Sequence, residues 1–482
     1  MASNRRDFLR QTLIGAGVLT TTGLISCTAS TKSKNEQKTY TPNGAQLFNM
    51  CGYAAPRLNQ VRVGFIGLGM RGPGAVERMS HIGGVQIVAL CDIREEKVEA
   101  CQKKLEEKGL PRAKSYTGTA DAWKAMCESP DIDLVYICTP WELHTPMAVM
   151  AMECGKHAAV EVPAAKTIDE CWQLVETSER TKKHCMMLEN CCYDFFELLT
   201  LNMARQGFFG EIIHGEGAYI HNLLNMNFAK DRYYDMWRLK ENYLNGNLYP
   251  THGLGPICQV MDINRGDRMD YLVAMQSNDF QMAAKAQELA ATDEFYKQFT
   301  GHSFRGNMSN TTIRTEKGRT ILVQHDVTSP RPYSRIHLVS GTKGVARKWP
   351  SPERVATGHE WFTDEEMTKL YDTYTPEIVQ KVGEMAKQVG GHGGMDFMMD
   401  WRLIDCLRNG LALDQDVYDA ATWSCIAPLS IQSVANRSNS VDVPDFTRGA
   451  YKTNQPIELT LKGGGTTEVR AAKVASEAQL SV

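Results

Sequence analysis

The stretch Val61-Arg62-Val63-Gly64-Phe65-Ile66-Gly67-Leu68-Gly69-Met70-Arg71-Gly72 decides the fold of this chain. An apolar, β-branched run leads directly into G-x-G-x-x-G, and the next apolar run ends at an acidic residue, Asp92. This order is typical of a strand, a tight glycine turn and a helix whose N-terminus faces the phosphates of a dinucleotide. The carboxylate binds the ribose hydroxyls and repels a 2′-phosphate, so the pattern favours NAD over NADP.

Apolar runs typical of buried strands alternate with helical patterns from Val61 to about Asn190. Such alternation predicts a doubly wound parallel sheet with helices on both faces, and the glycine turn after the first strand makes it a Rossmann pattern. We assign residues 58–190 to an NAD-binding Rossmann domain. The predicted strands are 61–66, 85–91, 113–116, 134–138, 157–161 and 185–188, and the helices between them include 95–107, 120–128, 146–154 and 168–181.

The pattern changes after Asn190. Runs that alternate or carry β-branched residues are separated by turns with Gly or Asn, which predicts a second α+β domain over residues 191–450, built on a mostly antiparallel sheet. Helical periodicity returns over residues 391–430, and residues 451–482 form a C-terminal tail. We expect the active site between the two domains, at the carboxyl ends of the parallel strands. The strands expected here are 211–220, 271–277, 311–314, 319–325 and 335–340.

The N-terminus has the layout of a bacterial export signal. Paired arginines, Arg5-Arg6, precede Phe8-Leu9 and an uncharged run that ends at Ser26-Cys27, which resembles a twin-arginine signal joined to a lipobox. The alternative is a basic leader with ordinary cleavage. We therefore assign residues 1–27 to a signal and residues 28–48 to a polar tether. This predicts location in the periplasm or cell envelope, with membrane contact only through a lipid on Cys27.

Composition limits the remaining function classes. The 482 residues include 43% hydrophobic ones, enough for two sizeable cores, and the net charge of −3 comes without a basic block, which argues against a nucleic-acid partner. The 14 cysteines form no C-x-x-C pair, and there is no His-Glu-x-x-His, so we expect no metal site. Because twin-arginine export carries folded proteins, thiols buried and NAD bound beforehand would suit this route. We also expect a homo-oligomer.

Two loops at the expected ligand edge carry chemistry. Thr139-Pro140-Trp141-Glu142-Leu143-His144 follows the fourth strand and is expected to face the nicotinamide half, although plain packing explains Trp141 equally well. Glu161-Val162-Pro163 ends the fifth strand. A carboxylate there is costly to bury unless it has a partner, which makes Glu161 a functional candidate.

These features resemble the glucose–fructose oxidoreductase, inositol dehydrogenase and MocA family. In that family the fifth strand usually ends in Glu-Lys-Pro, and the lysine assists proton transfer from the sugar hydroxyl. Here Val162 stands at the lysine position. A valine cannot exchange a proton, which argues against ordinary sugar dehydrogenase chemistry.

Further motifs resemble one branch, glycoside hydrolase family 109, whose members are NAD-dependent α-N-acetylgalactosaminidases. The resemblance extends from about residue 45 to 450, and the valine is a feature of this branch. The motifs are Leu188-Glu189-Asn190-Cys191-Cys192-Tyr193, Trp237-Arg238, Leu248-Tyr249-Pro250-Thr251-His252-Gly253-Leu254-Gly255-Pro256, Arg331-Pro332-Tyr333 and Gly391-His392-Gly393-Gly394-Met395-Asp396.

The resemblance implies a set of site residues. Tyr193, Tyr249 and His252 are the catalytic candidates, with the base and the acid among them left open. Each of four residues also has a non-functional explanation. Tyr219 and Tyr333 could be half-buried aromatic residues that only pack, His252 could cap a helix, and His392 could be structural. The implied cofactor contacts are Gly67, Gly69, Met70, Arg71, Gly72, Asp92, Trp141, Glu142, Leu143, His144, Glu161, Val162 and Asn190, and the implied sugar contacts are Tyr219, Arg238, Tyr249, Pro250, Thr251, His252 and Tyr333.

The implied reaction differs from that of glycosidases with two carboxylates across the bond. A hydride leaves C3 of the sugar, the C2 proton becomes acidic, the C1 substituent is eliminated, water adds and the hydride returns. The protein would then hydrolyse terminal α-N-acetylgalactosamine of glycans with an NAD that stays tightly bound and is recycled. The alternatives are a sugar or cyclitol dehydrogenase or epimerase of the wider family, and a surface lipoprotein that binds glycans without catalysis.

Overall fold

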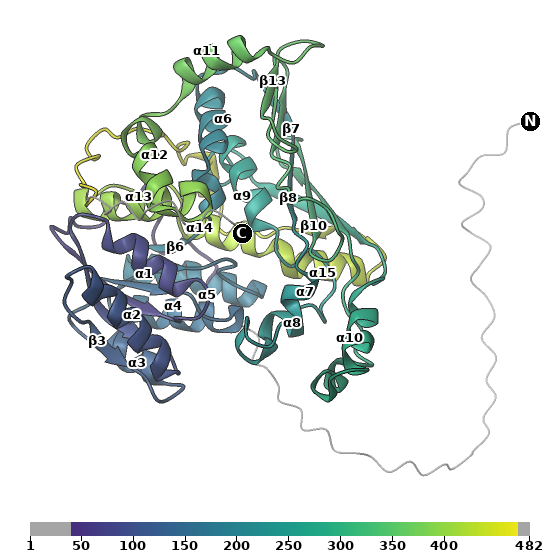
Figure 1. Ribbon diagram of the computed structural model, residues 1–482. Coiled ribbons are helices and arrows are strands. Elements are labelled where there is room, and N and C mark those ends of the chain that lie inside the picture. Colours follow the sequence, from purple (N-terminus) through teal and green to yellow (C-terminus); the bar gives the residue numbers. More distant parts are fainter. Residues whose placement is uncertain (1–39, 471–482) are drawn as a thin grey trace, which may run out of the picture. The chain divides into compact units, whose positions relative to one another are not determined.

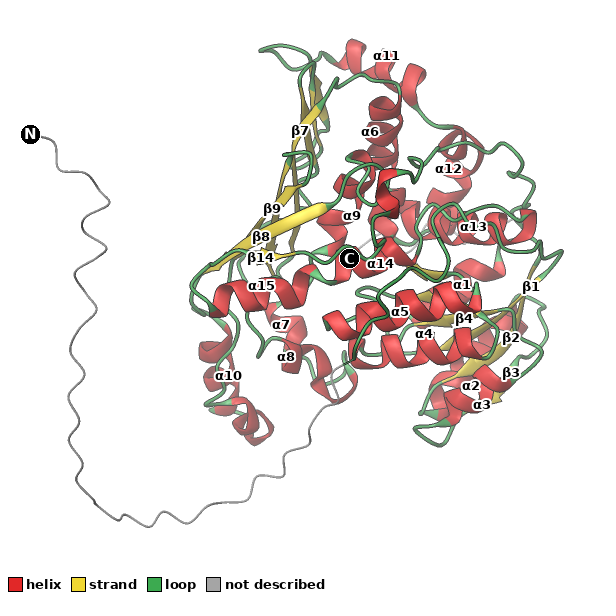
Figure 2. Ribbon diagram, turned by 180° about the vertical axis from the view of Figure 1, so that it is seen from behind, coloured by secondary structure: helices red, strands yellow, loops and turns green. Residues whose placement is uncertain are grey.

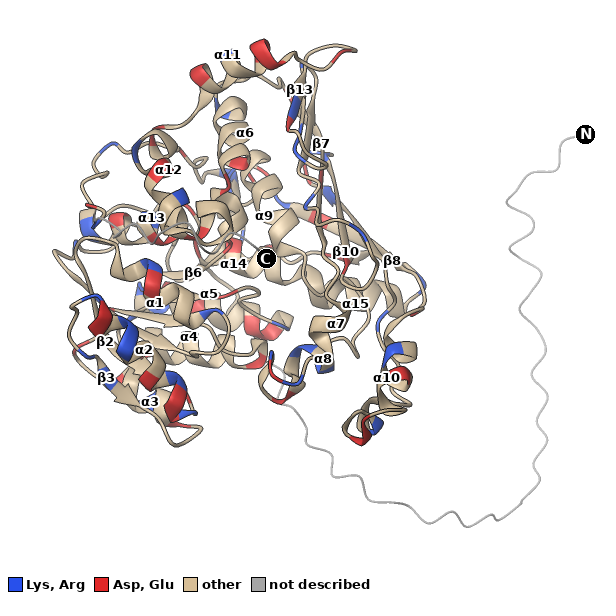
Figure 3. Cartoon of the chain, viewed as in Figure 1, with Lys and Arg blue, Asp and Glu red and all other residues tan. Residues whose placement is uncertain are grey.

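The computed structural model describes residues 40–470 (Figure 1). The predicted signal, with Cys27, and residues 28–39 of the predicted tether lie outside the described residues, as do residues 471–482 of the predicted tail. Among the helices of the described part, none combines the length and apolar character that a membrane span requires. Figure 3 shows Lys and Arg interspersed with Asp and Glu over this part of the chain.

The first sheet is parallel and has six strands, which confirms the predicted doubly wound α/β fold. Its order is β3 (Lys114–Tyr116), β2 (Val85–Cys91), β1 (Val61–Ile66), β4 (Leu134–Ile137), β5 (His157–Val160) and β6 (Cys185–Met187). The apolar runs form strands because both faces are covered, and β4 and β5 are buried along their whole length. The connecting helices are α1 (Gly72–Ser80), α2 (Glu95–Glu107), α3 (Ala122–Glu128), α4 (His144–Glu153) and α5 (Ile168–Thr181).

The second sheet has eight strands and is mostly antiparallel, as predicted. Only β7 and β10 pair in parallel. The sequence did not reveal β12, β13 and β14, because strands of two or three residues are too short to display an alternating pattern. The order is β13 (Arg354–Ala356), β12 (Val345–Arg347), β11 (Leu338–Gly341), β7 (Ile212–Ile220), β10 (Thr320–Asp326), β9 (Ser309–Thr315), β8 (Met269–Gln276) and β14 (Val441–Asp442).

Helices cover one face of the second sheet, as Figure 2 shows from behind. Helix α9 (Thr251–Val260) packs on β7, and α15 (Ile426–Ala435) packs on β8. The remaining helices of eight or more residues are α6 (Phe195–Arg205), α10 (Met282–Ala290), α11 (Asp364–Tyr374), α12 (Glu377–Val389), α13 (Met395–Asn409) and α14 (Val417–Ser424).

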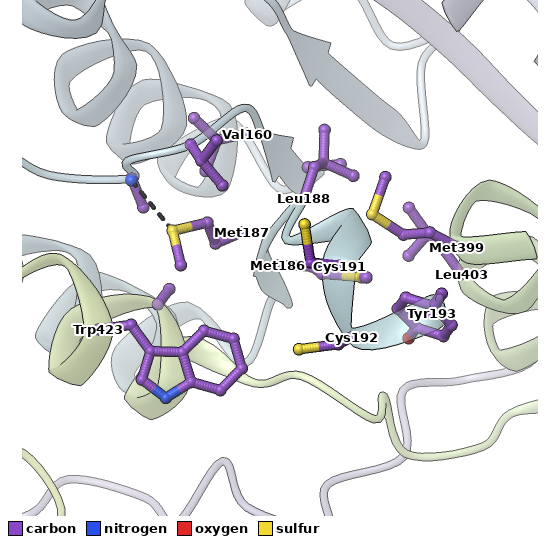
Figure 4. Close-up of a cluster of buried hydrophobic side chains, with 14 of the residues drawn as sticks. Val160, Met186, Met187, Leu188, Cys191, Cys192, Tyr193, Met399, Leu403 and Trp423 are labelled. Carbon is purple, nitrogen blue, oxygen red and sulfur yellow. Dashed lines mark hydrogen bonds between the residues drawn. The ribbon is translucent and has the colours of Figure 1, made fainter. Parts of the chain in front are cut away.

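One continuous core joins the two sheets. Figure 4 shows its junction, where the side chains that follow β6 pack between α13 and α14. Met187 and Leu188 come from the β6 side, Met399 and Leu403 from α13, and Trp423 from α14. The residues that follow β6 are therefore fixed by packing from both parts of the chain.

Two glycines allow α9 to lie directly on β7. A Cβ atom on Gly253 would stand 2.1 Å from the backbone nitrogen of Ala218, and one on Gly217 would stand 2.2 Å from the carbonyl oxygen of Gly253. Real Cβ atoms do not approach so closely, so any larger residue would push the helix off the strand. This contact sets the start of α9, which carries His252, against the end of β7, which carries Tyr219.

Candidate active site

A cavity of about 680 Å³ opens at the carboxyl ends of the parallel strands, where the sequence predicted the site. Its walls come from the loops after β1, β2, β4, β5 and β6 on one side, and from β7, the start of α9 and the segment between them on the other. Of the predicted site residues, it gathers Gly67, Gly69, Met70, Arg71, Asp92, Trp141, His144, Glu161, Val162, Asn190, Tyr219, Arg238, Tyr249 and His252.

The glycine turn fits the phosphates of a dinucleotide. A Cβ on Gly67, whose φ is +88°, would stand 2.6 Å from the carbonyl oxygen of Cys138, and a Cβ on Gly72 would stand 2.1 Å from that of Gly67. By contrast, a Cβ on Gly69 would meet only Nη2 of Arg94, at 3.6 Å. The outer glycines are therefore required by packing, while the middle one leaves the backbone open toward the cavity, where a pyrophosphate approaches.

Asp92 is held in place at the end of β2. Its Oδ2 accepts the N–H of Leu68 at 2.7 Å, and its Oδ1 accepts the N–H of Arg94 at 3.0 Å and the Nε–H of the same residue at 3.1 Å. The structure thus pairs the side chain of Arg94 with Asp92. The carboxylate keeps lone pairs for ribose hydroxyls, so the residues present fit NAD.

Glu161 has the partner that its burial requires. Nε of Arg71, which follows the glycine turn, lies 2.9 Å from Oε1 of Glu161, and Nη1 of Arg71 lies 3.3 Å from Oδ2 of Asp396 on α13. Burial acts to raise the pKa of Asp396, but the hydrogen bond with His392 and the charges of Arg71 and Arg78 outweigh it and hold the pKa well below its ordinary value. This network ties the NAD side of the cavity to the second part of the chain.

His392 lies in the cavity wall, on the short turn η6 (His392–Gly394). Its Nδ1 is 2.9 Å from Oδ2 of Asp396, and its side chain is 53% exposed. The amide of Asn190 donates a hydrogen bond to the other oxygen of Asp396. The sequence allowed a purely structural role for His392, whereas the structure presents an imidazole at the cavity with one nitrogen held by a carboxylate.

A hydrogen-bonded chain leads from the cavity into the core. The hydroxyl of Tyr249 lies 3.3 Å from Nε2 of His252, and Nδ1 of His252 lies 2.7 Å from Oε1 of Glu189, whose side chain is fully buried. Burial acts to raise the pKa of Glu189, but the charge of His252 and hydrogen bonds from His252 and the Cys191 N–H outweigh it, so the pKa is lowered from its ordinary value.

Glu189 was absent from the predicted site, although the signal was available. It follows β6 just as Glu161 follows β5, so the argument about a buried carboxylate applies to both. Ligand atoms of Glu189, Cys191 and His252 also lie within 4.8 Å of one another, a grouping that a metal ion could use. The 2.7 Å contact between Glu189 and His252 is nevertheless that of a hydrogen bond. Two ligands of a tetrahedral zinc, each about 2.0 Å from it, would stand roughly 3.3 Å apart.

Aromatic rings surround the guanidinium of Arg238. Its centre lies 5.2 Å from the ring of Tyr249, 5.4 Å from Trp141 and 5.6 Å from Tyr233. Trp141 stacks on Tyr249 at 5.7 Å, so it both packs and lines the cavity. Within residues 40–470, Arg238 has no carboxylate at ion-pair distance, so its N–H groups are available to oxygen atoms of a ligand.

Tyr219, near the end of β7, lines the cavity on the side of the second sheet. Its hydroxyl lies 3.1 Å from Nδ1 of His221, and its ring centre is 4.6 Å from that of Tyr249 and 5.4 Å from that of His252. Burial raises the pKa of Tyr219 above its ordinary value, although the charge of Arg238 acts against this. His221 also lines the cavity and was not predicted.

The placement of Tyr193 corrects its prediction as an acid or base. Its side chain is 2% exposed, does not line the cavity and lies in the core shown in Figure 4. Its hydroxyl faces Oδ2 of Asp414 at 3.3 Å, and that carboxylate is paired with Arg402. The phenol points into the core because the turn η3 (Asn190–Tyr193) leaves only Asn190 facing the cavity.

Six further predicted contacts lie outside the lining. Gly72, Glu142 and Leu143 adjoin residues that line the cavity without lining it themselves. Pro250 precedes the first turn of α9, and Thr251 is fully buried. Tyr333 stands behind the wall, with its ring centre 5.1 Å from that of His221.

Comparisons with known proteins identify the family of the chain. A family model described as the C-terminal domain of glycosyl hydrolase 109 matches residues 193–453, and one described as the NAD-binding Rossmann fold of an oxidoreductase family matches residues 61–189. A glycosyl hydrolase family 109 protein of Bacteroides fragilis is 50% identical over 448 residues, 89% of this chain and 95% of that protein. One of Porphyromonas gingivalis is 53% identical over 413 residues, 82% of this chain and 86% of that protein.

Solved structures share the fold. A levoglucosan dehydrogenase in complex with NADH matches 80% of this chain and all of its own, with a TM-score of 0.60 at 18% identity. A scyllo-inositol dehydrogenase of Lactobacillus casei matches 80% of this chain and 99% of its own, with a TM-score of 0.56 at 14% identity. The NAD-binding family model establishes NAD as the cofactor, and these neighbours show that the fold is shared.

Replacing Asp92 tests the cofactor site. We expect Asp92→Asn to weaken NAD⁺ binding about tenfold or more, because a charged acceptor for the ribose hydroxyls is lost. The preference over NADP⁺ should shrink as well. Titration calorimetry with each nucleotide measures both effects. Glu95→Gln, an exposed carboxylate three residues away, should leave both affinities unchanged; equal affinities in wild type and Asp92→Asn would contradict the assignment.

Proposed function

Because the chain belongs to glycosyl hydrolase family 109, we propose that it hydrolyses terminal α-linked N-acetylgalactosamine of glycans with the help of its NAD. One observation carries this proposal: the chain of Tyr249, His252 and Glu189 opens into the same cavity as the glycine turn and Asp92. Groups able to move protons therefore line the same cavity as the residues that would hold the hydride acceptor.

The residues of the cavity suit an oxidation at C3 followed by loss of the C2 proton. Bound NAD⁺ supplies uptake of the C3 hydride and its later return. We assign the proton transfers at O3 and C2 to Tyr249 and His252 together, since a hydrogen bond joins them. Val162 lines the cavity but has no proton to exchange, so it takes no part in this transfer.

Glu189 supports the charged form of His252. A buried carboxylate with a lowered pKa stays ionised, and at 2.7 Å from Nδ1 it stabilises the imidazolium that forms when Nε2 accepts a proton. It also orients the ring so that Nε2 faces Tyr249. Glu189 touches neither sugar nor cofactor in this account and is a positioning residue.

His392 is suited to assist the leaving oxygen at C1. It lies at the cavity wall with its Nδ1 held by Asp396, which leaves Nε2 to donate or accept a proton. Arg238 and Tyr219 offer hydrogen-bond groups to sugar hydroxyls or to the acetamido oxygen, and the face of Trp141 packs beside them. The leaving glycan would extend toward His392, the more exposed side.

We also propose that the chain is exported through its predicted signal, folds with NAD before crossing the membrane, and is anchored by a lipid on Cys27 in the cell envelope. In support, the 13 cysteines within residues 40–470 are all free thiols and none is exposed. We propose a homo-oligomer as well, which sedimentation velocity would distinguish from a monomer of 53.9 kDa.

A lipid anchor makes the location testable. Cells of the native host fed a labelled fatty acid should label the wild-type chain, while Cys27→Ser should lose the label and move from the membrane to the soluble fraction. Cys51→Ser, which changes a half-buried cysteine of the folded part, is the matched control. An unlabelled wild-type chain would refute the anchor.

The reaction itself is tested with a nitrophenyl α-N-acetylgalactosaminide. We expect nitrophenol release with no net gain in NADH absorbance, because the hydride returns to the sugar. NADH that accumulates with free sugars or cyclitols would support the alternative, a dehydrogenase or epimerase of the wider family. If neither nitrophenol nor NADH is formed, the protein would be a lipoprotein that binds glycans without catalysis.

Substitutions test the assigned residues. Tyr249→Phe and His252→Ala should each lower kcat about one hundredfold or more, the usual contribution of a positioned acid or base, while NAD affinity is retained. Glu189→Gln should lower kcat about tenfold or more. Tyr193→Phe is the matched control, because it removes a phenol hydroxyl outside the cavity. Wild-type kcat in both Tyr249→Phe and His252→Ala would remove the site assignment.

A further inference from the structure

One segment, residues 223–241, forms a strap along the cavity. It contains α7 (Leu224–Asn227), the turn η4 (Tyr234–Met236) and α8 (Trp237–Glu241). Eight of the residues that line the cavity, from Leu223 to Arg238, come from this segment alone. It reaches from the NAD end, beside Arg94, to the wall near Tyr249, where Arg238 lies. A dinucleotide in the cavity would contact the strap along most of its length.

Part of the strap rests on a small cluster of its own, while Leu223, Met226 and Trp237 pack against the main core. Phe228, Met236 and Leu239 of the strap pack with side chains of α10 and of the turn η5 (Glu294–Phe299), in a cluster separate from the main core. Figure 2 shows α7 and α8 lying between the parallel sheet and α10. The strap is therefore supported from two sides, by this cluster and by the main core.

A cation–π contact joins the strap to the NAD end of the cavity. The guanidinium of Arg94 lies 5.3 Å from the ring centre of Tyr234. Arg94 is also bonded to Asp92, which the ribose hydroxyls would contact. Opening the strap here would uncover the adenosine half of the cofactor.

An ion pair joins the other end of the strap to the parallel layer. Nζ of Lys166, on the loop before α5, lies 2.6 Å from Oε1 of Glu241. The side chains are 25% and 13% exposed, so water screens this pair less than it screens a fully exposed one. Between the two ends, Trp237 of the strap meets Trp141 edge-on at 5.4 Å.

We propose that residues 223–241 retain the NAD, with the Arg94–Tyr234 contact and the Lys166–Glu241 ion pair acting as two latches that set the rate of cofactor exchange. A recycled cofactor does not have to leave the protein between turnovers, so slow exchange does not lower the turnover rate. The same device would keep NAD bound in a compartment that supplies none. The inference rests on the NAD site and is independent of the glycosidase activity.

Cofactor exchange tests the latches directly. Protein loaded with radiolabelled NAD⁺ is chased with excess unlabelled NAD⁺, and the label that remains bound is followed in time. Tyr234→Ala and Glu241→Gln should each speed release about threefold, and together about tenfold, as expected for a partly exposed cation–π contact and ion pair. Added salt should speed release from the wild type and have less effect on Glu241→Gln.

Further variants show whether the effect is specific to the Lys166–Glu241 ion pair. Lys166→Gln breaks the same ion pair from the parallel layer and should match Glu241→Gln. Asp235→Asn breaks an exposed ion pair within the strap, with Lys240 at 2.7 Å, and should leave release unchanged. Thermal unfolding with saturating NAD⁺ verifies that each variant is folded. Unchanged release in the double variant, or equal acceleration by Asp235→Asn, would overturn the proposal; neither outcome depends on whether the protein cleaves a glycoside.

Discussion

The hydrogen bond between the buried carboxylate of Glu189 and Nδ1 of His252 is the contact on which the site depends. A carboxylate with no exposed surface is tolerated only when it is paired and hydrogen-bonded. Glu189 lies two residues beyond the end of β6 in the parallel sheet. His252 stands in the first turn of α9, which lies on β7 of the second sheet. The bond that joins the two sheets at the cavity is therefore also the bond that orients the imidazole of His252.

The same device appears twice at neighbouring strand ends. Glu161 follows β5 and holds Arg71 beside the glycine turn, while Glu189 follows β6 and holds His252 at the cavity wall. Each carboxylate reaches a basic side chain from another part of the chain, and Arg71 passes the link on to Asp396 of α13. The two ends of the cavity are thus each fixed by a buried carboxylate hydrogen-bonded to a side chain from another part of the chain.

The sequence predicted the parallel sheet and its glycine turn better than it predicted which side chains pair at the cavity. The glycine turn, Asp92 and the alternation of strands and helices are local patterns, so the parallel sheet could be read from them. Burial at a strand end predicted that Glu161 needs a partner, but not that Arg71 supplies it, because the partner is set by folding. Tyr193 was wrong because a short turn decides which of four consecutive residues faces the cavity. His392 stayed ambiguous until α13 was seen to bring Asp396 to its ring.

A solvent isotope experiment distinguishes proton removal at C2 and hydride transfer at C3, both proposed for this cavity, from direct displacement at C1. The protein is allowed to cleave a nitrophenyl α-N-acetylgalactosaminide in D₂O, and the released sugar is analysed by NMR and mass spectrometry. We expect deuterium at C2, because a proton removed there exchanges with solvent before it is replaced. We expect no deuterium at C3, because the hydride returns from the cofactor. Complete cleavage with hydrogen retained at C2 would contradict the proposal and point to direct displacement at C1.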